Sequence, residues 1–148
     1  MATNMKTIKF GENGETYAVN SPAVSASGEL TEAAAKLDFG TFENGLTEVE
    51  LVSAGVSDGT GDYFHVTING VRTGFITFNA VYTGVLTMRI KKVGSLWTAT
   101  GTIAGNMLSY VVELLNKNTV DKITSISIDA YNGAKGFAAG HKYALEGR

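Results

Sequence analysis

A glycine-rich acidic loop, residues 58–62, carries the residue types best suited to bind a metal ion. The carboxylates of Asp58 and Asp62, together with loop carbonyls, are hard oxygen ligands of the kind that calcium prefers. The further acidic positions and the closing Glu of an EF-hand loop are missing, and the composition of the loop is equally typical of a solvated turn. We therefore expect a turn here, with no metal ion and no other cofactor.

His65 and His141 are the only histidines, and histidine is the usual general acid or base near neutral pH. Such a role requires a carboxylate beside the imidazole in a cleft, and a small hydrolase built from Asp58, Asp62 and His65 is the form that it would take here. A histidine without such partners is usually a packed or surface residue. With two histidines and no cysteine, one chain cannot supply a multi-histidine or cysteine zinc site.

No nucleophile or phosphate-binding motif accompanies these residues. The G-x-S-x-G pattern, the P-loop and a G-x-G-x-x-G loop before a helix are all absent from the sequence. Glu48 and Glu50 share one face of a predicted strand, but no second element places them in the cleft that glycosidase chemistry requires. We therefore expect that the protein is not an enzyme.

Aromatic residues suggest a binding function instead. The rings of Trp97, Tyr63 and Tyr131 could stack on the apolar face of a sugar, which makes them candidate glycan contacts. A single Trp inside a strand is also commonly part of a half-buried core. The sequence leaves both interpretations of Trp97 open.

The composition limits the remaining functions. The chain has 148 residues, of which 44% are hydrophobic and 18% charged, with 18 Gly, one Pro and no Cys. This composition is typical of one β-rich domain with Gly and Asn turns, and it excludes a coiled coil, a collagen and a disordered chain. A net charge of −2 without a Lys/Arg block predicts no nucleic-acid partner. No apolar run approaches the ~20 residues of a membrane span, and residues 1–10 hold no signal-peptide core, so we expect neither a membrane partner nor export.

Residues 1–28 are predicted to form an N-terminal arm with a linker. Residues 6–10 and 16–19 alternate polar and apolar types around a Gly-Asn turn, which predicts a β-hairpin. Because an isolated hairpin is marginal in water, Ile8, Phe10, Tyr17 and Val19 are predicted to anchor it to a partner or to the main domain. Residues 20–28 are small and polar, which predicts a linker. The Ala-rich residues 31–37 then predict a short helix with a Thr cap.

Residues 29–148 are predicted to form one domain. Alternation of polar and apolar types predicts strands over residues 47–52, 63–69, 72–81, 85–92, 96–103, 107–115, 123–129 and 142–145. Turn signals separate them at Asn69-Gly70, at Thr83-Gly84 and around Gly94. Residues 107–115 also fit helical spacing, but their β-branched residues favour a strand. Such strands, with no helix between them, predict an all-β fold, an antiparallel jelly-roll-like β-sandwich.

Residues 121–147 hold a distinctive series: an I-T-S-I-S-I strand, then Asn132-Gly133, then a G-F-A-A-G loop and a final strand. This series resembles the closing hairpin of β-sandwich domains in tailed-bacteriophage virion proteins of the head-fibre and capsid-decoration type. The matching residues are Ile123, Ser125, Ile126, Ile128, Phe137, Ala139, Gly140, Leu145 and Gly147. Glu146 stands where the family pattern has Tyr. The N-terminal hairpin with its following stretch is similar to the anchor of the same proteins.

The resemblance implies a phage structural protein, a capsid-decoration or head-fibre subunit of the virion that is made in the host bacterial cytoplasm. Its partners would be the major capsid protein or other virion subunits, contacted through the arm. The sandwich would project outward as part of a homotrimer. The rival hypothesis is a carbohydrate-binding module of a phage tail or receptor-binding protein, with a glycan on the three aromatic residues named above.

Overall fold

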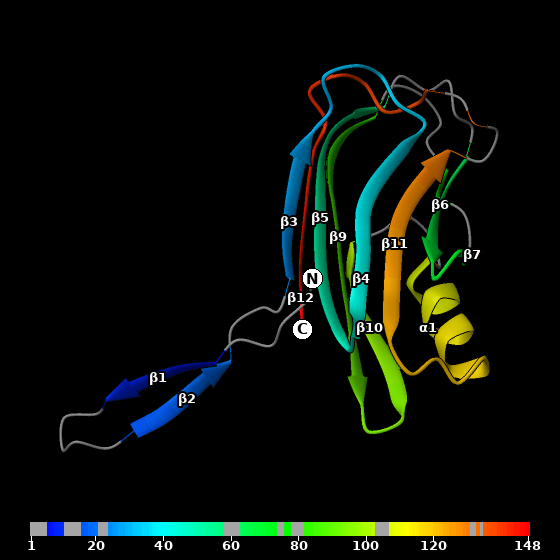
Figure 1. Ribbon diagram of the computed structural model, residues 1–148. Coiled ribbons are helices and arrows are strands. Elements are labelled where there is room, and N and C mark those ends of the chain that lie inside the picture. Colours follow the sequence, from blue (N-terminus) through cyan, green and yellow to red (C-terminus); the bar gives the residue numbers. More distant parts are fainter. Residues whose placement is uncertain are drawn as a thin grey trace.

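The computed structural model describes residues 6–10, 16–20, 24–57, 63–73, 76–77, 82–102, 107–130, 133 and 135–148 (Figure 1). Most of them lie in strands, and the helix of this part of the chain is α1, Met107–Lys117. The strands are β1 (Lys6–Phe10), β2 (Thr16–Asn20), β3 (Val24–Glu29), β4 (Lys36–Leu46), β5 (Glu48–Ser57), β6 (Tyr63–Ile68), β7 (Val71–Arg72), β8 (Ile76–Thr77), β9 (Tyr82–Val93), β10 (Leu96–Thr102), β11 (Ile123–Ala130) and β12 (Lys142–Gly147).

Two antiparallel sheets form the sandwich, as Figure 1 shows. The first sheet has the strand order β10-β9-β5-β12-β3, and the second has the order β4-β11-β6-β7 with β8 also on β6. The pairs β3–β12, β4–β11, β5–β9 and β6–β7 are nested along the chain, the outermost pair joining the first and last strands of the sandwich. Nested pairing of this kind defines a jelly roll. The predicted all-β, jelly-roll-like sandwich is therefore confirmed, with β10 as an added edge strand.

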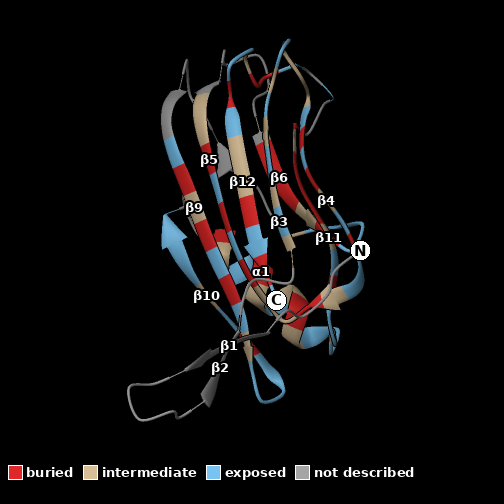
Figure 2. Cartoon of the chain, turned by 60° about the vertical axis from the view of Figure 1, so that its left-hand side comes forward, coloured by how far each residue is buried: buried red, intermediate tan, exposed pale blue. Residues whose placement is uncertain are grey.

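The core lies between the two sheets because alternate residues of each strand face inward. Figure 2 shows buried and exposed residues alternating along β9, β5 and β12. From the first sheet, Leu51, Met88 and Ile90 are at most 1% exposed, and Ile126 and Ile128 of β11 meet them from the second. Burying one such side chain contributes about 1.5–3 kcal/mol.

Helix α1 is where the sequence predicted a strand, so that prediction was wrong. Met107, Val111 and Leu115 are fully buried and stand four residues apart, the spacing of one helical face. The hydroxyl of Thr73, just after β7, donates to the Val66 carbonyl at 2.9 Å and lies 3.6 Å from the Met107 sulfur, so α1 begins beside the second sheet. Its other end contacts Trp97 of β10 in the first sheet. The helix thus closes the side of the sandwich between β10 and β7.

The predicted helix over residues 31–37 was also wrong. Residues 30–35 are not helical, and Lys36 already begins β4. Ala34 instead exchanges two backbone hydrogen bonds with Phe137, at 2.9 and 3.0 Å. A helix this short is unstable by itself, and tertiary hydrogen bonds therefore decide its conformation.

The linker prediction for residues 20–28 was wrong for its second half, because Val24 begins β3. This strand pairs along its whole length with β12. Its small residues have a packing role: a side chain at Gly28 would overlap the ring of Tyr143. The domain that follows the hairpin thus includes β3, which closes one edge of the first sheet.

Two turn predictions had different outcomes. Asn69 and Gly70 have φ of 52° and 79° and join Ile68 directly to its partner Val71, so a two-residue hairpin turn is confirmed. Thr83-Gly84, predicted as a reversal, lies inside β9 opposite the end of β5. Of predicted strand 72–81, Arg72 and residues 76–77 are strand and several others lie outside the described residues.

Candidate functional site

Four polar residues form a block on the outer face of the second sheet. Phe64 and Val66 of β6 point into the core. Because side chains alternate along a strand, His65 and Thr67 belong to the opposite face of the sheet. In the register of β6 and β11, His65 lies opposite Asp129, and Thr67 lies opposite Ser127. The sequence singled out His65 but not its partners, because the register of two strands far apart in the chain is a property of the sheet.

The carboxylate of Asp129 is the centre of this block. Its Oδ2 accepts hydrogen bonds from the hydroxyls of Thr67 at 2.7 Å and Ser127 at 3.0 Å. The same oxygen lies 3.6 Å from Nε2 of His65. Each hydroxyl has a single proton, and both protons are held by the carboxylate. Neither hydroxyl is therefore poised to give its proton to the imidazole, as a nucleophile of the Ser–His type must.

Burial lowers the pKa of His65 from its ordinary value. The positive charge of Arg72 lowers the pKa further, while the Asp129 carboxylate acts in the opposite direction. The imidazole is therefore neutral at pH 7, and its side chain is only 2% exposed. The buried, neutral imidazole packs against the carboxylate, which itself accepts two hydroxyl hydrogen bonds, so this block stabilises the second sheet.

His141 is buried against aromatic residues. Its ring lies edge-on to Phe137, with the ring centres 5.3 Å apart, and Phe137 in turn packs on Phe64 at 4.6 Å. A side chain at Gly55 would overlap the imidazole. These contacts give His141 a packing role at the end of the sandwich.

Trp97 is buried rather than displayed. The residue is 2% exposed, and its indole N–H donates to the carbonyl of Val120 at 2.8 Å. The ammonium of Lys92 lies 5.7 Å from the ring centre, within reach of a cation–π interaction. A sugar cannot stack on this ring, so the glycan contact considered for Trp97 is contradicted by its position. The side chain of Tyr63 and all of Tyr131 lie outside the described residues.

The acidic loop with Asp58 and Asp62 also lies outside the described residues. Within the residues that the structure does describe, no group of three or more His, Asp or Glu side chains could hold a metal ion. Glu48 is held by Arg89, whose Nη2 lies 3.2 Å from Oε1. Glu50 shares the outer face of β5 with it, as predicted.

The closing segment has the geometry expected of its residues. Phe137 is 1% exposed and fills the end of the sandwich, and Gly140 has the φ of +87° that a tight bend requires. Phe137 therefore belongs to the core at this end, and Gly140 supplies the bend before β12.

The hairpin β1–β2 is confirmed, and its register divides the predicted anchor residues. Ile8 pairs with Ala18, and Lys9 pairs with Tyr17. Because successive positions of a strand belong to opposite faces, Ile8 and Phe10 belong to one face of the ribbon and Tyr17 and Val19 to the other. An anchor that uses all four residues must therefore be enclosed on both faces.

No family model and no curated protein matches this sequence. Over the described part of the chain, no helix has the length and apolar character needed to cross a membrane.

Proposed function

We propose that this chain is a non-enzymatic structural subunit of a tailed-bacteriophage virion, a capsid-decoration or head-fibre protein. In this proposal the hairpin β1–β2 attaches the subunit to the major capsid protein or a neighbouring virion subunit. The jelly roll projects outward and assembles with other copies. The observation that carries the proposal is that, among the described strands, β1 and β2 pair only with each other.

An isolated two-stranded hairpin is marginal in water, which favours a partner surface for it. The division of its apolar residues between two faces supports an anchor inserted between structures rather than laid on one. Its free edges can also add to a sheet of the partner, in which case main-chain hydrogen bonds provide affinity. The resemblance of residues 121–147 to virion sandwich domains points to the capsid as that partner.

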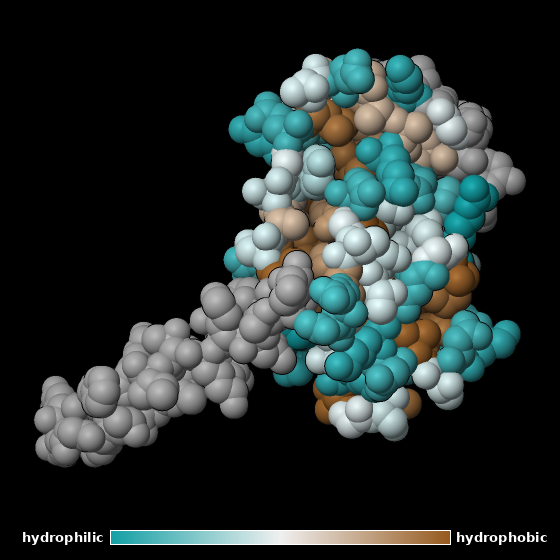
Figure 3. Space-filling model, viewed as in Figure 1, coloured by the Kyte–Doolittle hydropathy of each residue, from teal (hydrophilic) through white to brown (hydrophobic). Residues whose placement is uncertain are grey.

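The sandwich has properties that suit dense display on a particle. In the view of Figure 3, hydrophilic residues cover most of the described surface, and hydrophobic residues form small separate patches. Such a surface resists non-specific association. The carbohydrate-binding alternative loses its main residue, because the ring of Trp97 is buried.

Attachment to particles tests the proposal. The full chain and a variant that begins at Val24 would be incubated with phage particles that lack the protein, and the bound fraction measured by sedimentation. The truncation must stop before Val24, because removing residues 24–28 would take β3 from the first sheet. We expect the full chain to bind and the shortened chain to remain in solution. Binding by the shortened chain, or by neither, would overturn the proposal.

Two matched double variants refine the test. Ile8→Asp with Phe10→Asp alters one face of the hairpin, and Tyr17→Asp with Val19→Asp alters the other. An anchor enclosed on both faces loses at least tenfold in affinity with either pair. Trp97 fluorescence and circular dichroism would establish that the sandwich is folded in each variant. Unchanged attachment of both double variants would remove the hairpin from the proposal.

A further inference from the structure

The outer face of the first sheet has a pattern that is complementary to itself. The residues that face outward there, here called the pairing face, come from β3, β12, β5 and β9. They form three successive rows across the sheet in the register of the strands: Glu29, Lys142, Ala54 and Val85; Ser27, Ala144, Val52 and Thr87; Ser25, Glu146, Glu50 and Arg89.

The first row borders a hollow. A depression of about 400 Å³ lies over the small residues Ser27, Gly28, Ala54 and Ala144, with Lys142 at its side. Next to it, the apolar side chains of Val52 and Val85 are 37% and 53% exposed. This part of the face therefore offers space, exposed apolar surface and one ammonium group, with the carboxylate of Glu29 on β3 directly across from Lys142. Lys142 has no carboxylate within 4 Å among the described side chains.

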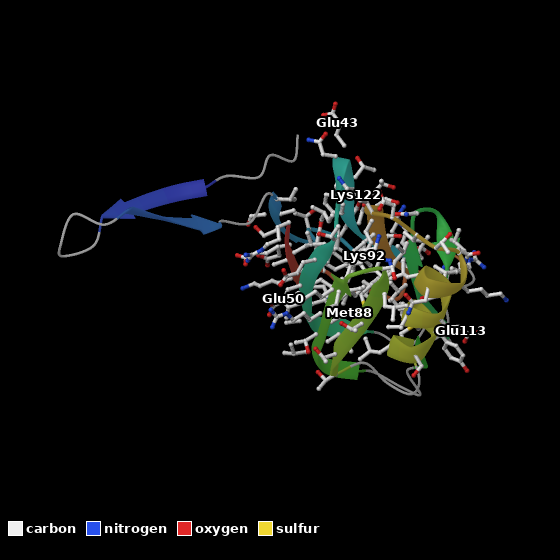
Figure 4. The ribbon with its side chains drawn as sticks, turned by 90° about the horizontal axis from the view of Figure 1, so that it is seen from below. Glu43, Glu50, Met88, Lys92, Glu113 and Lys122 are labelled. Carbon is white, nitrogen blue, oxygen red and sulfur yellow. The ribbon has the colours of Figure 1, made fainter. Side chains whose placement is uncertain are left out.

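The third row is more acidic than the first, with Glu146 and Glu50 at the positions where the first row has Lys142 and Ala54. Glu146 and Glu50 lie directly across from each other on neighbouring strands, which is an unfavourable like-charge arrangement. The nearby guanidinium of Arg89 bonds to Glu48 at 3.2 Å, and that of Arg148 lies 3.9 Å from the same carboxylate. No cation of the described residues lies within 4 Å of Glu50 or Glu146. Figure 4 shows Glu50 on the side of the molecule away from α1 and its Glu113.

A two-fold axis relates these two rows. Lys142 and Glu146 stand two residues before and two residues after Ala144 on β12, about 7 Å to either side of it. Consider a second copy turned by 180° about an axis that passes through Ala144, lies in the plane of contact and runs perpendicular to the strands. This rotation places Lys142 of one copy against Glu146 of the second. The same operation repeats the contact with the roles reversed, as an isologous interface requires. The long glutamates of each copy then enter the hollow of the other.

We propose that the pairing face binds a second copy of this chain, face to face and with two-fold symmetry. Each lysine receives Glu146 and Glu50 of the partner, which relieves the like-charge pair. Ala144 and Val52 of the middle row are removed from water at the same time. This contact makes a dimer, unlike the homotrimer that the resemblance implies, and it does not depend on the proposed virion role.

The size of the face sets the expected affinity. Four strands about 4.8 Å apart, over about six residues of 3.3 Å each, cover roughly 400 Å² in each copy. The total of roughly 800 Å² is below the area of a standard specific interface and is typical of a weak contact. We therefore expect a dimer that dissociates on dilution in the micromolar range and that weakens at high salt, because much of its specificity comes from charge.

Charge reversal tests this geometry. The mass of the full chain would be measured by analytical ultracentrifugation over a concentration series, together with Lys142→Glu and with Glu146→Lys. Each variant brings like charges together twice, so we expect its dimer dissociation constant to rise at least tenfold. Glu113→Lys makes the same charge change as Glu146→Lys, but on α1; it is the matched control for that variant and should leave the dimer unchanged. Circular dichroism of each variant would establish folding.

Mixing the two charge-reversal variants is the decisive step. In a mixed pair, the introduced glutamate of one copy meets the introduced lysine of the other, and the unaltered Lys142 and Glu146 meet at the second contact. Both contacts are then favourable, so we expect a 1:1 mixed dimer with an affinity within about threefold of the unaltered dimer. A chain that is monomeric at 100 μM (about 1.6 mg/ml), an oligomer that ignores both reversals, or a mixture that stays monomeric would each overturn the proposal. None of these outcomes bears on attachment to particles, which is a separate measurement.

Discussion

The side-chain amide of Asn116 takes the place of a neighbouring strand for Trp97. Its Oδ1 accepts the backbone N–H of Trp97 at 2.7 Å, and its Nδ2 donates to the carbonyl of the same residue at 3.2 Å. Trp97 belongs to β10, an edge strand of the first sheet. Unpaired backbone groups on an edge invite pairing with other chains. Helix α1 therefore protects this edge as well as filling the side of the sandwich.

Asn116→Ala is expected to lower the free energy of unfolding by about 1–3 kcal/mol, because it leaves two partly buried backbone groups without a partner. Asn118→Ala is the matched control, since the Asn118 amide bonds only to the exposed end of the helix at Leu114. That variant should lose less than about 1 kcal/mol. Denaturant unfolding followed by Trp97 fluorescence measures both. Equal losses would show that the contact with Trp97 has no special role.

His65 makes stability depend on pH. Because its pKa in the folded protein is lowered from the ordinary value of 6.5, the unfolded chain binds more protons below that pH. The contribution of the neutral imidazole to stability is complete above pH 6.5 and is lost as the pH falls below it toward the lowered value. Unfolding midpoints between pH 8 and pH 5 would therefore decrease more steeply for the unaltered protein than for His65→Gln. His141 is present in both proteins, so a difference in slope between them is due to His65. Parallel curves would contradict the conclusion that the lowered pKa of His65 makes stability depend on pH.

Asn69 joins the β6–β7 turn to the start of β11. Its Oδ1 accepts from the backbone N–H of Thr124 at 2.7 Å and of Ser125 at 3.3 Å, and its Nδ2 donates to the Lys122 carbonyl at 3.0 Å. Asn69→Gly keeps access to the φ of 52° and removes these bonds, so we expect a loss of about 1–3 kcal/mol. Asn69→Asp keeps the acceptor and should lose less. If thermal unfolding ranks the two variants in the opposite order, the side-chain bonds are not what stabilises the turn.

Gly101 has a steric requirement that Gly94 lacks. Both have positive φ, +146° and +60°, but only at Gly101 would a Cβ overlap the backbone carbonyl of Thr87 on the neighbouring strand. Gly94→Ala should cost about 1–2 kcal/mol for its left-handed backbone. Gly101→Ala should cost more than about 3 kcal/mol, because the β9–β10 pairing must separate. Urea unfolding of the two variants provides the comparison, and similar costs would mean that the strands adjust freely.

The neighbours of the candidate site residues could not be predicted from the sequence of any single strand, because they depend on how distant strands pair. His65 and Glu50 were predicted to lie on strands, and they do, because alternation is a local property. Their partners Asp129 and Glu146 come from strands far along the chain, and a shift of register by one residue would have turned either to the other face. The position of Trp97 was open for the same reason: whether its face is covered depends on α1.

The β-rich class, the period-two strands and the Asn69-Gly70 turn could be predicted from the order of the residues alone. These features follow from side-chain alternation and from backbone conformations that only certain residues adopt easily. Tertiary structure decided the three segments where local preference is weak. Residues 107–117 became a helix because the open side between β10 and β7 takes an apolar stripe with helical spacing. Residues 24–29 form a strand because β12 supplies hydrogen-bond partners for their backbone. Residues 31–35 do not form a helix because Ala34 bonds to the backbone of Phe137. In short segments such as these, the available backbone hydrogen-bond partners decide the conformation.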